Sequence, residues 1–475
     1  MRDDNKLSMR KTMTLIAFSS LLTTMAQTLG AETAMAAAEA KKEPALSPTE
    51  EWIQKSKHPV SWLKWGADLR LREEYYSNTK QNSSNPDHET NQQRARMRLW
   101  AEITPWESFT FRMRAMSEPR TYIKPDSKQG YMGELLLDNL SVSLSPENLP
   151  LQALIGRQEL SDLKIPWLLQ DGTTTDGSRT TFFDAARLTY TSPDENTSVH
   201  GIFLYQDERS DAWVPPVGMQ PSLKYLSEED IVSGMLLIRN KSLENTTLEG
   251  LVIYKHEFES DQILGTTGDT VTIRPKVAYK IDDHWDFEAE AAGQFGRRGD
   301  HLGNNMRDVV ALGALSQLQY RFRDDLNNTA WVGVEYLSGR GKGSETDHGF
   351  DNLWGRYSRI GELMSYVTRL DGGRAYDYSN MLSPIVGYSI DPIRDMRVTV
   401  DYRPMFAPEN PYAGDRNHSE DGSFKGHLVR CRADYTFNKH AKAGMLFEAL
   451  EPGNYYSDRA NDTTYYFRLE LTLTY

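Results

Sequence analysis

Arginine recurs at every second position in several stretches of this chain. Arg94, Arg96 and Arg98 alternate with apolar or small residues, and Arg112 and Arg114 do the same a few residues later. Successive side chains of a β-strand point to opposite faces, so these arginines would share one face of a sheet. A guanidinium group is planar and binds a carboxylate through two parallel hydrogen bonds. Such rows predict a surface that binds carboxylated ligands.

The same alternation extends this polar face to other segments of the chain. The residues that we expect on it are Arg70, Arg72, Arg94, Arg96, Arg98, Arg112, Arg114, Arg157, Arg397, Arg403, Arg430, Arg432, Arg468 and Glu470. Acidic residues alternate in the same way at Asp286, Glu288 and Glu290. Pairing of opposite charges along a wetted wall is therefore the alternative to a surface selective for anions.

The last nine residues indicate which element carries these side chains. Phe467, Leu469, Leu471, Leu473 and Tyr475 occupy one face of a predicted strand, and polar residues occupy the other. An apolar strand face that ends on an aromatic residue is typical of the closing strand of bacterial outer-membrane β-barrels. In that class the strand is also the signal read by the insertion machinery, which we therefore expect as a partner.

The rest of the chain predicts a complete barrel. About eighteen segments with period-two patterning follow Trp65, and eight short polar turns alternate with nine longer loops between them. This pattern predicts an all-β fold, an eighteen-stranded antiparallel transmembrane up-and-down β-barrel over residues 64–475. An even number of strands places both termini on the periplasmic side of the bacterial outer membrane, with membrane lipid around the barrel.

Aromatic residues cluster near several predicted strand ends. The clusters are Trp62 with Trp65, Tyr75 with Tyr76, Trp100 with Trp106, and Tyr455 and Tyr456 with Tyr465 and Tyr466. Their repetition predicts the two aromatic girdles that flank the apolar band of a membrane barrel.

The N-terminal region has the features of a secretion signal. Arg10 and Lys11 precede a short apolar stretch and then small residues, which predicts a signal peptide over residues 1–31. Residues 32–63 are expected to form a periplasmic tail with a short helix that begins near Ser47-Pro48-Thr49-Glu50.

Composition limits the classes of partner, cofactor and cross-link that we expect for this chain. The chain has 67 acidic and 54 basic residues, a net charge of −13, which argues against a nucleic-acid partner. Its single cysteine, Cys431, cannot form an intrachain disulfide and is expected on the apolar face of its strand. We expect no cofactor and no metal. Acidic loop segments such as 409–415 would suit calcium, but no ligand spacing singles out a site.

Four motifs in order resemble the alginate-export outer-membrane family over residues 62–475. They are residues 154–160 (LIGRQEL), 181–188 (TFFDAARL), 335–339 (EYLSG) and 451–456 (EPGNYY). The resemblance implies an eighteen-stranded monomeric barrel with an arginine-rich constriction that conducts a linear polyuronate. It places Arg157, Asp184 and Arg187 in matched motifs. Asp184 and Arg187 differ in parity, so both face the lumen only if a bulge lies between them.

Two loops are unusual. The longest, 339–379, is rich in glycine at both ends and carries Phe350, Trp354 and Tyr366 among other apolar residues. We expect it either to fold into the barrel as a plug or to pack on neighbouring loops outside. The loop 160–180, with Trp167 after Pro166, is a second candidate for the inward position.

The predicted function is an outer-membrane diffusion channel for an anionic, alginate-like polysaccharide or its oligosaccharides, without catalysis. A general or sugar-selective porin of the same fold is the main alternative. An outer-membrane enzyme is disfavoured because the chain has no HExxH or GxSxG motif. A plugged importer is disfavoured because residues 32–63 are too few for a plug domain. A passive pore does not distinguish import from export.

Overall fold

The computed structural model describes residues 47–128, 130, 134–169, 182–208, 214, 216–217, 230–260 and 265–475. The signal peptide expected at residues 1–31 and the tail before Ser47 lie outside the described residues. In the first of two units, which ends at Ser56, helix α2 (Pro48–Lys57) begins where the sequence predicts a helix start. There the Glu50 N–H donates to Oγ of Ser47 at 3.2 Å.

Helices are few among the described residues of the second unit. α3 (Met364–Leu370) is accompanied by three short 3-10 turns, η1 (Thr79–Gln81), η2 (Ser161–Leu163) and η4 (Asp458–Ala460). No described helix has both the length and the apolar character needed to cross a membrane.

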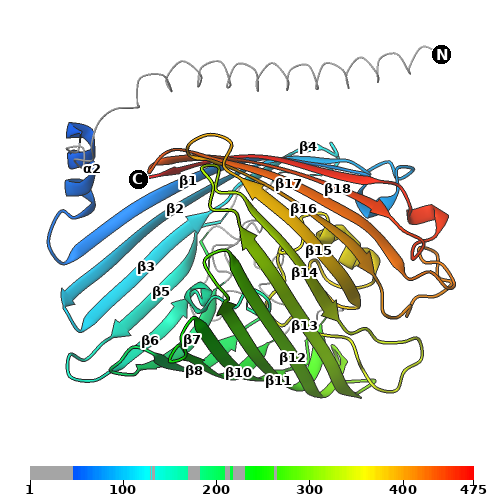
Figure 1. Ribbon diagram of the computed structural model, residues 1–475, viewed down its shortest axis with the longest axis horizontal. Helices are drawn as coiled ribbons and strands as arrows, with labels where there is room; N and C mark the ends of the chain where they lie inside the picture. Colours follow the sequence, from blue (N-terminus) through cyan, green and yellow to red (C-terminus); the bar gives the residue numbers. More distant parts are fainter. Residues whose placement is uncertain are drawn as a thin grey trace, which may run out of the picture. The chain divides into compact units, whose positions relative to one another are not determined.

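The β-strands form one sheet that closes on itself (Figure 1). Neighbouring strands are antiparallel, and β1 pairs with β19 as well as with β2. The alternating polar and apolar residues supply the two faces that a closed sheet needs. The strands are β1 (Leu63–Ser77), β2 (Thr90–Trp106), β3 (Phe109–Ser117), β4 (Arg120–Lys124), β5 (Leu136–Leu144), β6 (Leu151–Gln158), β7 (Phe183–Thr191), β8 (Thr197–Gln206), β9 (Ile231–Asn240), β10 (Thr246–Glu257), β11 (Thr266–Lys280), β12 (Trp285–Asp300), β13 (Arg307–Arg321), β14 (Thr329–Leu337), β15 (Met381–Ile390), β16 (Met396–Phe406), β17 (Phe424–Asn438), β18 (Ala441–Pro452) and β19 (Thr464–Thr474).

β3 and β4 share one strand position, because both pair with β2 along the same edge. Pro119 lies between them, and the ladder is interrupted there because proline has no N–H to donate. The barrel therefore has 18 strand positions, which confirms the predicted fold class.

Connections alternate between the two rims of the barrel. We call the rim where β1 begins and β19 ends the short-turn end, and the opposite rim the long-loop end. The connection 301–306 between β12 and β13, at the long-loop end, is a hairpin turn. Asp300 closes this turn, because its carboxylate accepts the N–H groups of Leu302 and Asn304 at 3.0 and 2.9 Å.

The outward face of the barrel is apolar. On β19, Leu469 and Leu473 are 40% and 39% exposed, whereas Arg468, which precedes Leu469 and has the opposite parity, is 5% exposed. Cys431 lies opposite Val400 and Phe447 on this outward face, as expected. An apolar exterior over a polar interior is the arrangement that a membrane-spanning barrel requires.

Only some of the aromatic residues predicted to form girdles lie on the outward face of the barrel. Trp65 packs against Tyr475 with ring centroids 5.1 Å apart, on the outward face at the short-turn end. Tyr455 is completely buried among the loops instead. Trp100 shares its strand face with Arg98 and therefore points into the barrel, so its predicted girdle position is wrong.

Candidate pore wall and inward-folded loops

The arginine rows of β1 and β2 meet on the inner face of the barrel. In the register of this pair, Arg70 stands opposite Arg96 and Arg72 stands opposite Arg94. All four are 6% exposed or less. Like charges directly opposite each other across two strands are unfavourable, so this arrangement needs compensating carboxylates.

Two glutamates lie between these arginines. Glu118, just after β3, ion-pairs with Arg70 at 3.0 Å and with Arg94. Glu74 ion-pairs with Arg72 at 3.3 Å and with Arg94 at 3.1 Å. Because each carboxylate bridges two guanidinium groups, neighbouring arginines are held side by side.

Two further carboxylates complete this part of the wall. Glu470 accepts a hydrogen bond from Nε of Arg72 at 2.8 Å. Asp68 pairs with Arg98 at 2.8 Å and lies 3.9 Å from Arg96. Five arginines thus share four carboxylates on β1, β2 and their neighbours, which leaves a small positive excess. We call this set, Arg70, Arg72, Arg94, Arg96 and Arg98 with Asp68, Glu74, Glu118 and Glu470, the arginine wall.

A second group of predicted residues surrounds a cavity of about 280 Å³ on the inner face of β3, β5, β6 and β7. Arg112, which lines it, has a side chain that is 37% exposed. Arg187 also lines it and ion-pairs with Asp162 at 2.8 Å. Arg114, on the same strand face as Arg112, is paired with Asp138 at 2.8 Å. This cavity brings Arg112 and Arg187 together, which the sequence alone could not show.

Arg157 and Asp184 are not lumen residues. They are register partners and ion-pair at 2.9 Å, but Asp184 also stands opposite Tyr205, which is 40% exposed on the outward face. No register shift separates Asp184 from Arg187, so the bulge that would bring both inside is not present. Arg157 is completely buried, with its guanidinium 4.1 Å from the Phe182 ring centroid. Their expected place in the pore is therefore wrong.

The remaining predicted arginines differ in exposure. Arg430 pairs with Asp401 at 2.9 Å and also donates to the carbonyl oxygen of Arg359 at 3.3 Å. Arg432 pairs with Asp434 at 2.6 Å, and both side chains are more than 40% exposed. The inner wall is thus water-accessible towards the short-turn end and closed further along β17.

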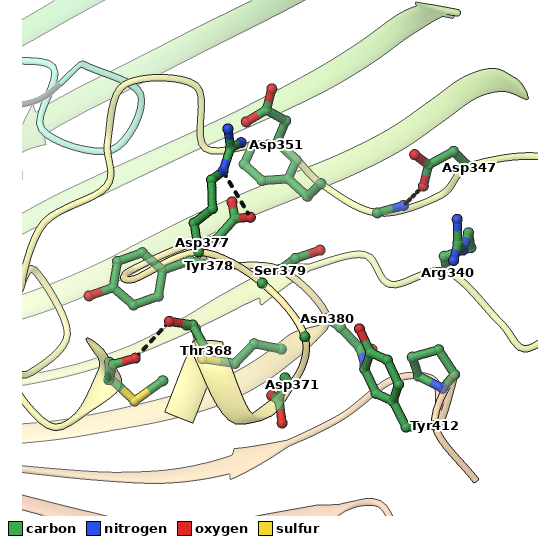
Figure 2. A pocket seen from close by; sticks show the side chains of 18 of the residues that line it. Arg340, Asp347, Asp351, Thr368, Asp371, Asp377, Tyr378, Ser379, Asn380 and Tyr412 are labelled. Carbon is green, nitrogen blue, oxygen red and sulfur yellow. Dashed lines mark hydrogen bonds and ion pairs between the residues drawn. The ribbon is translucent and has the colours of Figure 1, made fainter. Parts of the chain in front are cut away.

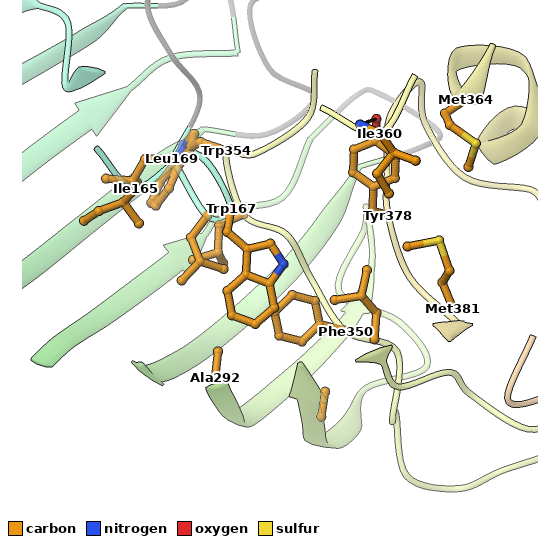
Figure 3. Packing of buried hydrophobic residues seen from close by; sticks show 14 of the residues in the cluster. Ile165, Trp167, Leu169, Ala292, Phe350, Trp354, Ile360, Met364, Tyr378 and Met381 are labelled. Atoms are coloured by element: carbon orange, nitrogen blue, oxygen red, sulfur yellow. Dashed lines mark hydrogen bonds between the residues drawn. The ribbon is translucent and has the colours of Figure 1, made fainter. Parts of the chain in front are cut away.

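Two loop segments cover the part of the inner wall that water does not reach. The 338–380 loop and the described segment 159–169 fold into the barrel and pack on its inner wall (Figure 3). Trp167 stacks on Phe350 with ring centroids 5.4 Å apart. Gly313 of β13 leaves room for this pair, because an added Cβ would lie 2.7 Å from Phe350 and 2.8 Å from Trp167. Of the two placements considered for the long loop, the structure has the inward one.

Glu335 on β14 is the centre of the polar contacts that hold these segments. It is completely buried and accepts hydrogen bonds from Trp167 Nε1 at 3.2 Å, Arg359 at 2.6 Å and Arg403 at 3.4 Å. One carboxylate thus joins both inward segments to strands β14 and β16. A buried charge of this kind is tolerated only when it is paired in this way.

Glu448 on β18 anchors the next part of the loop. Its carboxylate accepts the backbone N–H groups of Glu362 and Leu363 at 3.1 and 3.0 Å. Glu362 in turn accepts a hydrogen bond from Arg468 at 2.6 Å. Arg468, predicted as a pore residue, therefore holds the loop.

Sequence reasoning missed this set of anchors. Lys255 on β10 pairs with Asp351 of the loop at 3.2 Å, and Gln294 of β12 donates to the Asp351 carbonyl at 2.6 Å. The available signal was the inward parity of charged residues on strands that face an unusually apolar loop. That signal does not specify which loop residue each anchor meets.

The 338–380 loop also meets the 407–423 loop around a cavity of about 300 Å³ at the long-loop end (Figure 2). Asp371 contacts Nε2 of His418 at 3.2 Å and Lys425 at 2.7 Å, and Nδ1 of His418 contacts Asp415 at 2.7 Å. Burial lowers the pKa of His418, but its hydrogen bonds with Asp371 and Asp415 outweigh this effect and raise that pKa above 6.5. Burial acts to raise the pKa of Asp371, and Lys425 and His418 nevertheless hold it below 3.8.

Among the described residues, no group of three or more His, Cys, Asp or Glu side chains is placed to hold a metal ion.

A family model described as "Alginate export" matches residues 61–468. The chain belongs to this family. The match spans nearly the whole barrel and confirms the resemblance drawn from the four motifs. A search of curated proteins found no match.

Solved structures show the same fold at low sequence identity. OccK2 (OpdF) of Pseudomonas aeruginosa has a TM-score of 0.55 and 12% identity, with 86% of this chain and 97% of that chain covered. OccK2 in complex with glucuronate gives 0.53 and 12%, with the same coverage. A BenF-like porin from Pseudomonas fluorescens Pf-5 gives 0.53 and 11%, covering 87% and 98%. Together with the family match, these neighbours identify the protein as an outer-membrane channel of the alginate-export family.

Proposed function

We propose that this channel passes an anionic, alginate-like polysaccharide or its oligosaccharides along the arginine wall, without chemical catalysis. The observation that carries the proposal is the pairing of Arg70 with Arg96 and of Arg72 with Arg94 across β1 and β2. A neutral wall would avoid such like-charge neighbours, which cost stability. A passing carboxylate would exchange with Asp68 as the partner of Arg98, whose side chain is 14% exposed.

The family supports a polyuronate as the solute. A neighbour of the same fold, OccK2, has been solved in complex with glucuronate, which is a uronic acid. Glucuronate and oligomers of uronic acids are therefore the first probes to use. Several weak carboxylate sites in series would let a polymer slide without trapping it.

One observation favours a second candidate, a general porin. Each arginine of the arginine wall already has a carboxylate partner at ion-pair distance. Opposite charges that pair along a lumen can simply solvate the wall. A general porin would pass small ions and solutes without preference for polyuronates.

Variants of the arginine wall discriminate between the two candidates. Arg96→Gln and Arg98→Gln should weaken block of the ion current by an oligouronate and reduce selectivity for anions. Arg297→Gln is the matched control, since the Arg297 side chain is 65% exposed and its strand, β12, is not adjacent to β1 or β2. Equal block in all three variants and the native protein would favour the general porin.

We also propose that the short-turn end faces the periplasm, that the protein is a monomer, and that the strand ending at Tyr475 engages the insertion machinery. An even number of strands supports the first point, because it brings both barrel termini to one rim. Surface labelling of cells that carry a cysteine at position 439, in a short turn, or at position 420, in a long loop, tests it. Labelling at 439 but not at 420 would contradict the orientation.

A further inference from the structure

Two indole side chains face the lumen in the half of the barrel nearer the short-turn end. They are Trp100 on β2 and Trp331 on β14. Their chain neighbours Leu99 and Val332 are 55% and 53% exposed on the outward face. Because side chains alternate along a strand, both indoles point inward.

Each indole lies over a glycine of the adjacent strand. Trp100 is the register partner of Gly66, and Trp331 is the register partner of Gly387. A Cβ added at Gly66 would lie 2.6 Å from Cζ2 of Trp100, and one at Gly387 would lie 2.1 Å from Cζ2 of Trp331. The missing side chains let both rings lie along the wall instead of projecting across the lumen. The same arrangement thus occurs on two separate strand pairs.

Both rings remain available to a solute. Each indole is half-buried, unlike the nearly inaccessible residues of the arginine wall. Among the described residues, neither Nε1 donates to a protein acceptor within hydrogen-bond distance. A flat aromatic surface with an unsatisfied N–H at its edge is suited to a ligand that has both an apolar face and hydroxyl groups.

A cation lies beside the Trp100 ring. Nζ of Lys64 is 5.6 Å from the ring centroid of Trp100, and no carboxylate among the described residues ion-pairs with it. Arg114 is the register partner of Trp100 on β3. On the strands beside Trp331, Arg397 ion-pairs with Asp391 at 2.9 Å and donates to Oγ of Ser389, two residues along β15 from Gly387.

We propose that Trp100 and Trp331 are stacking platforms for the pyranose rings of the transported saccharide, and that Trp100 with Lys64 forms a subsite for one uronic acid unit. The C–H groups on one face of a pyranose ring carry partial positive charge and pack on the electron-rich face of an indole. The ring carboxylate would then bind the ammonium group of Lys64. This proposal rests on the proposed function and adds recognition of the sugar ring to recognition of its charge.

The experiment compares two polyanions in single-channel recordings of the full-length protein. One is an oligouronate, and the other is an acyclic polycarboxylate of similar charge, which has no ring to stack. Trp100→Ala and Trp331→Ala should shorten the residence of the oligouronate in the channel by roughly three- to tenfold. The residence of the acyclic polycarboxylate should stay the same. Trp100→Phe should retain much of the oligouronate residence, because phenylalanine keeps an aromatic face.

One control variant and one further test variant separate stacking from a structural role. Trp285→Ala removes an outward-facing indole that packs on Tyr320 at 4.7 Å, and it should leave both residence times unchanged. Lys64→Gln should shorten the residence of the oligouronate but not of a neutral oligosaccharide. Oligouronate residence that is unchanged in both Trp→Ala variants, or reduced equally for the two polyanions, would overturn the stacking proposal.

The neutral oligosaccharide also separates this proposal from the proposed function. If the native channel shows no preference for the oligouronate, but Trp→Ala variants shorten the residence of the neutral sugar, the proposed acidic solute fails and the stacking platforms stand. If native block by the oligouronate depends on Arg96 but not on either indole, the proposed function stands and the stacking platforms fail. A native channel blocked by neither saccharide contradicts both.

Discussion

At the scale of single residues, buried carboxylates organise the interior. Glu335 accepts hydrogen bonds from Arg359, Arg403 and Trp167. Because Glu335 is completely buried, these partners and not water stabilise its charge. Buried ion pairs add little net stability compared with an apolar core, but breaking one leaves an unpaired buried charge. Such residues therefore determine where the inward loop sits more than how stable the barrel is.

Glu335→Gln should release the inward segments. Loss of the carboxylate leaves Arg359 and Arg403 buried without their shared partner, at a cost of about 3–5 kcal/mol to the closed arrangement. We expect a higher single-channel conductance and faster proteolytic cleavage within residues 338–380. Glu288→Gln is the control, because Glu288 pairs with Lys276 at the wall and is 47% exposed. Unchanged conductance and cleavage in Glu335→Gln would contradict the role given to Glu335.

The contact between the 338–380 and 407–423 loops should depend on pH. The pKa of His418 is raised in the folded protein, so protonated His418 stabilises the contact below its unfolded pKa of about 6.5. That contribution is lost as the pH rises through the raised folded pKa. The pKa of Asp371 is lowered, so its contribution is present above 3.8 and is lost as the pH falls through the lowered folded value. The contact should therefore be tightest in mildly acidic solution.

Hydrogen exchange of residues 407–423 across this pH range measures the effect. Exchange, corrected for its intrinsic pH dependence, should increase on the alkaline side in the native protein. His418→Gln should remove most of that increase. An increase on the acidic side of 6.5 instead would contradict the assignment to His418.

At the scale of elements, strands were predictable and loop destinations were not. Period-two alternation fixed the faces of β1, β2 and β19, because one face must meet lipid and the other water. The alternation, together with a matched motif, also predicted Arg157 in the pore. The strand register shows instead that Arg157 lies on the outward face. Alternation cannot show that Glu448 caps a loop turn or that Arg468 meets Glu362, because those contacts join residues distant in sequence.

Gly313→Leu tests how the inward loops pack. A leucine side chain would occupy the space of the stacked Phe350 and Trp167, which lie 2.7 and 2.8 Å from the position of an added Cβ. We expect the loops to be displaced and the conductance to rise, while the barrel still forms. Gly201→Ala is the matched control, since nothing lies within 4 Å of its added Cβ. Identical conductance in Gly313→Leu and native protein would contradict the inward packing.

Cys431 tests strand parity without any substitution. Its cross-strand partners Val400 and Phe447 lie on the outward face, so the thiol should be surrounded by lipid. A charged maleimide should label it slowly in vesicles and a lipid-soluble maleimide should label it quickly. Arg432→Cys in a Cys431→Ser background should react readily with the charged reagent, because the neighbouring position faces the water-exposed lumen. The opposite order of reactivity would require a register shift in β17.

At the scale of the whole molecule, the barrel divides its interior along its length. Towards the short-turn end the inner wall carries exposed ion pairs such as Arg432 with Asp434. Further along, the arginine wall and the inward loops bury nearly all charged groups. Under the proposed function, an anionic chain would cross by exchanging carboxylates with the arginine wall.

The measurement that tests this account most directly is ion selectivity of the purified protein in a planar bilayer, repeated with polyuronate added. The account predicts a current carried mainly by anions and blocked by polyuronate, with weaker block in Arg96→Gln. A current without preference for anions, or carried mainly by cations, and unaffected by polyuronate would contradict it and leave a general porin.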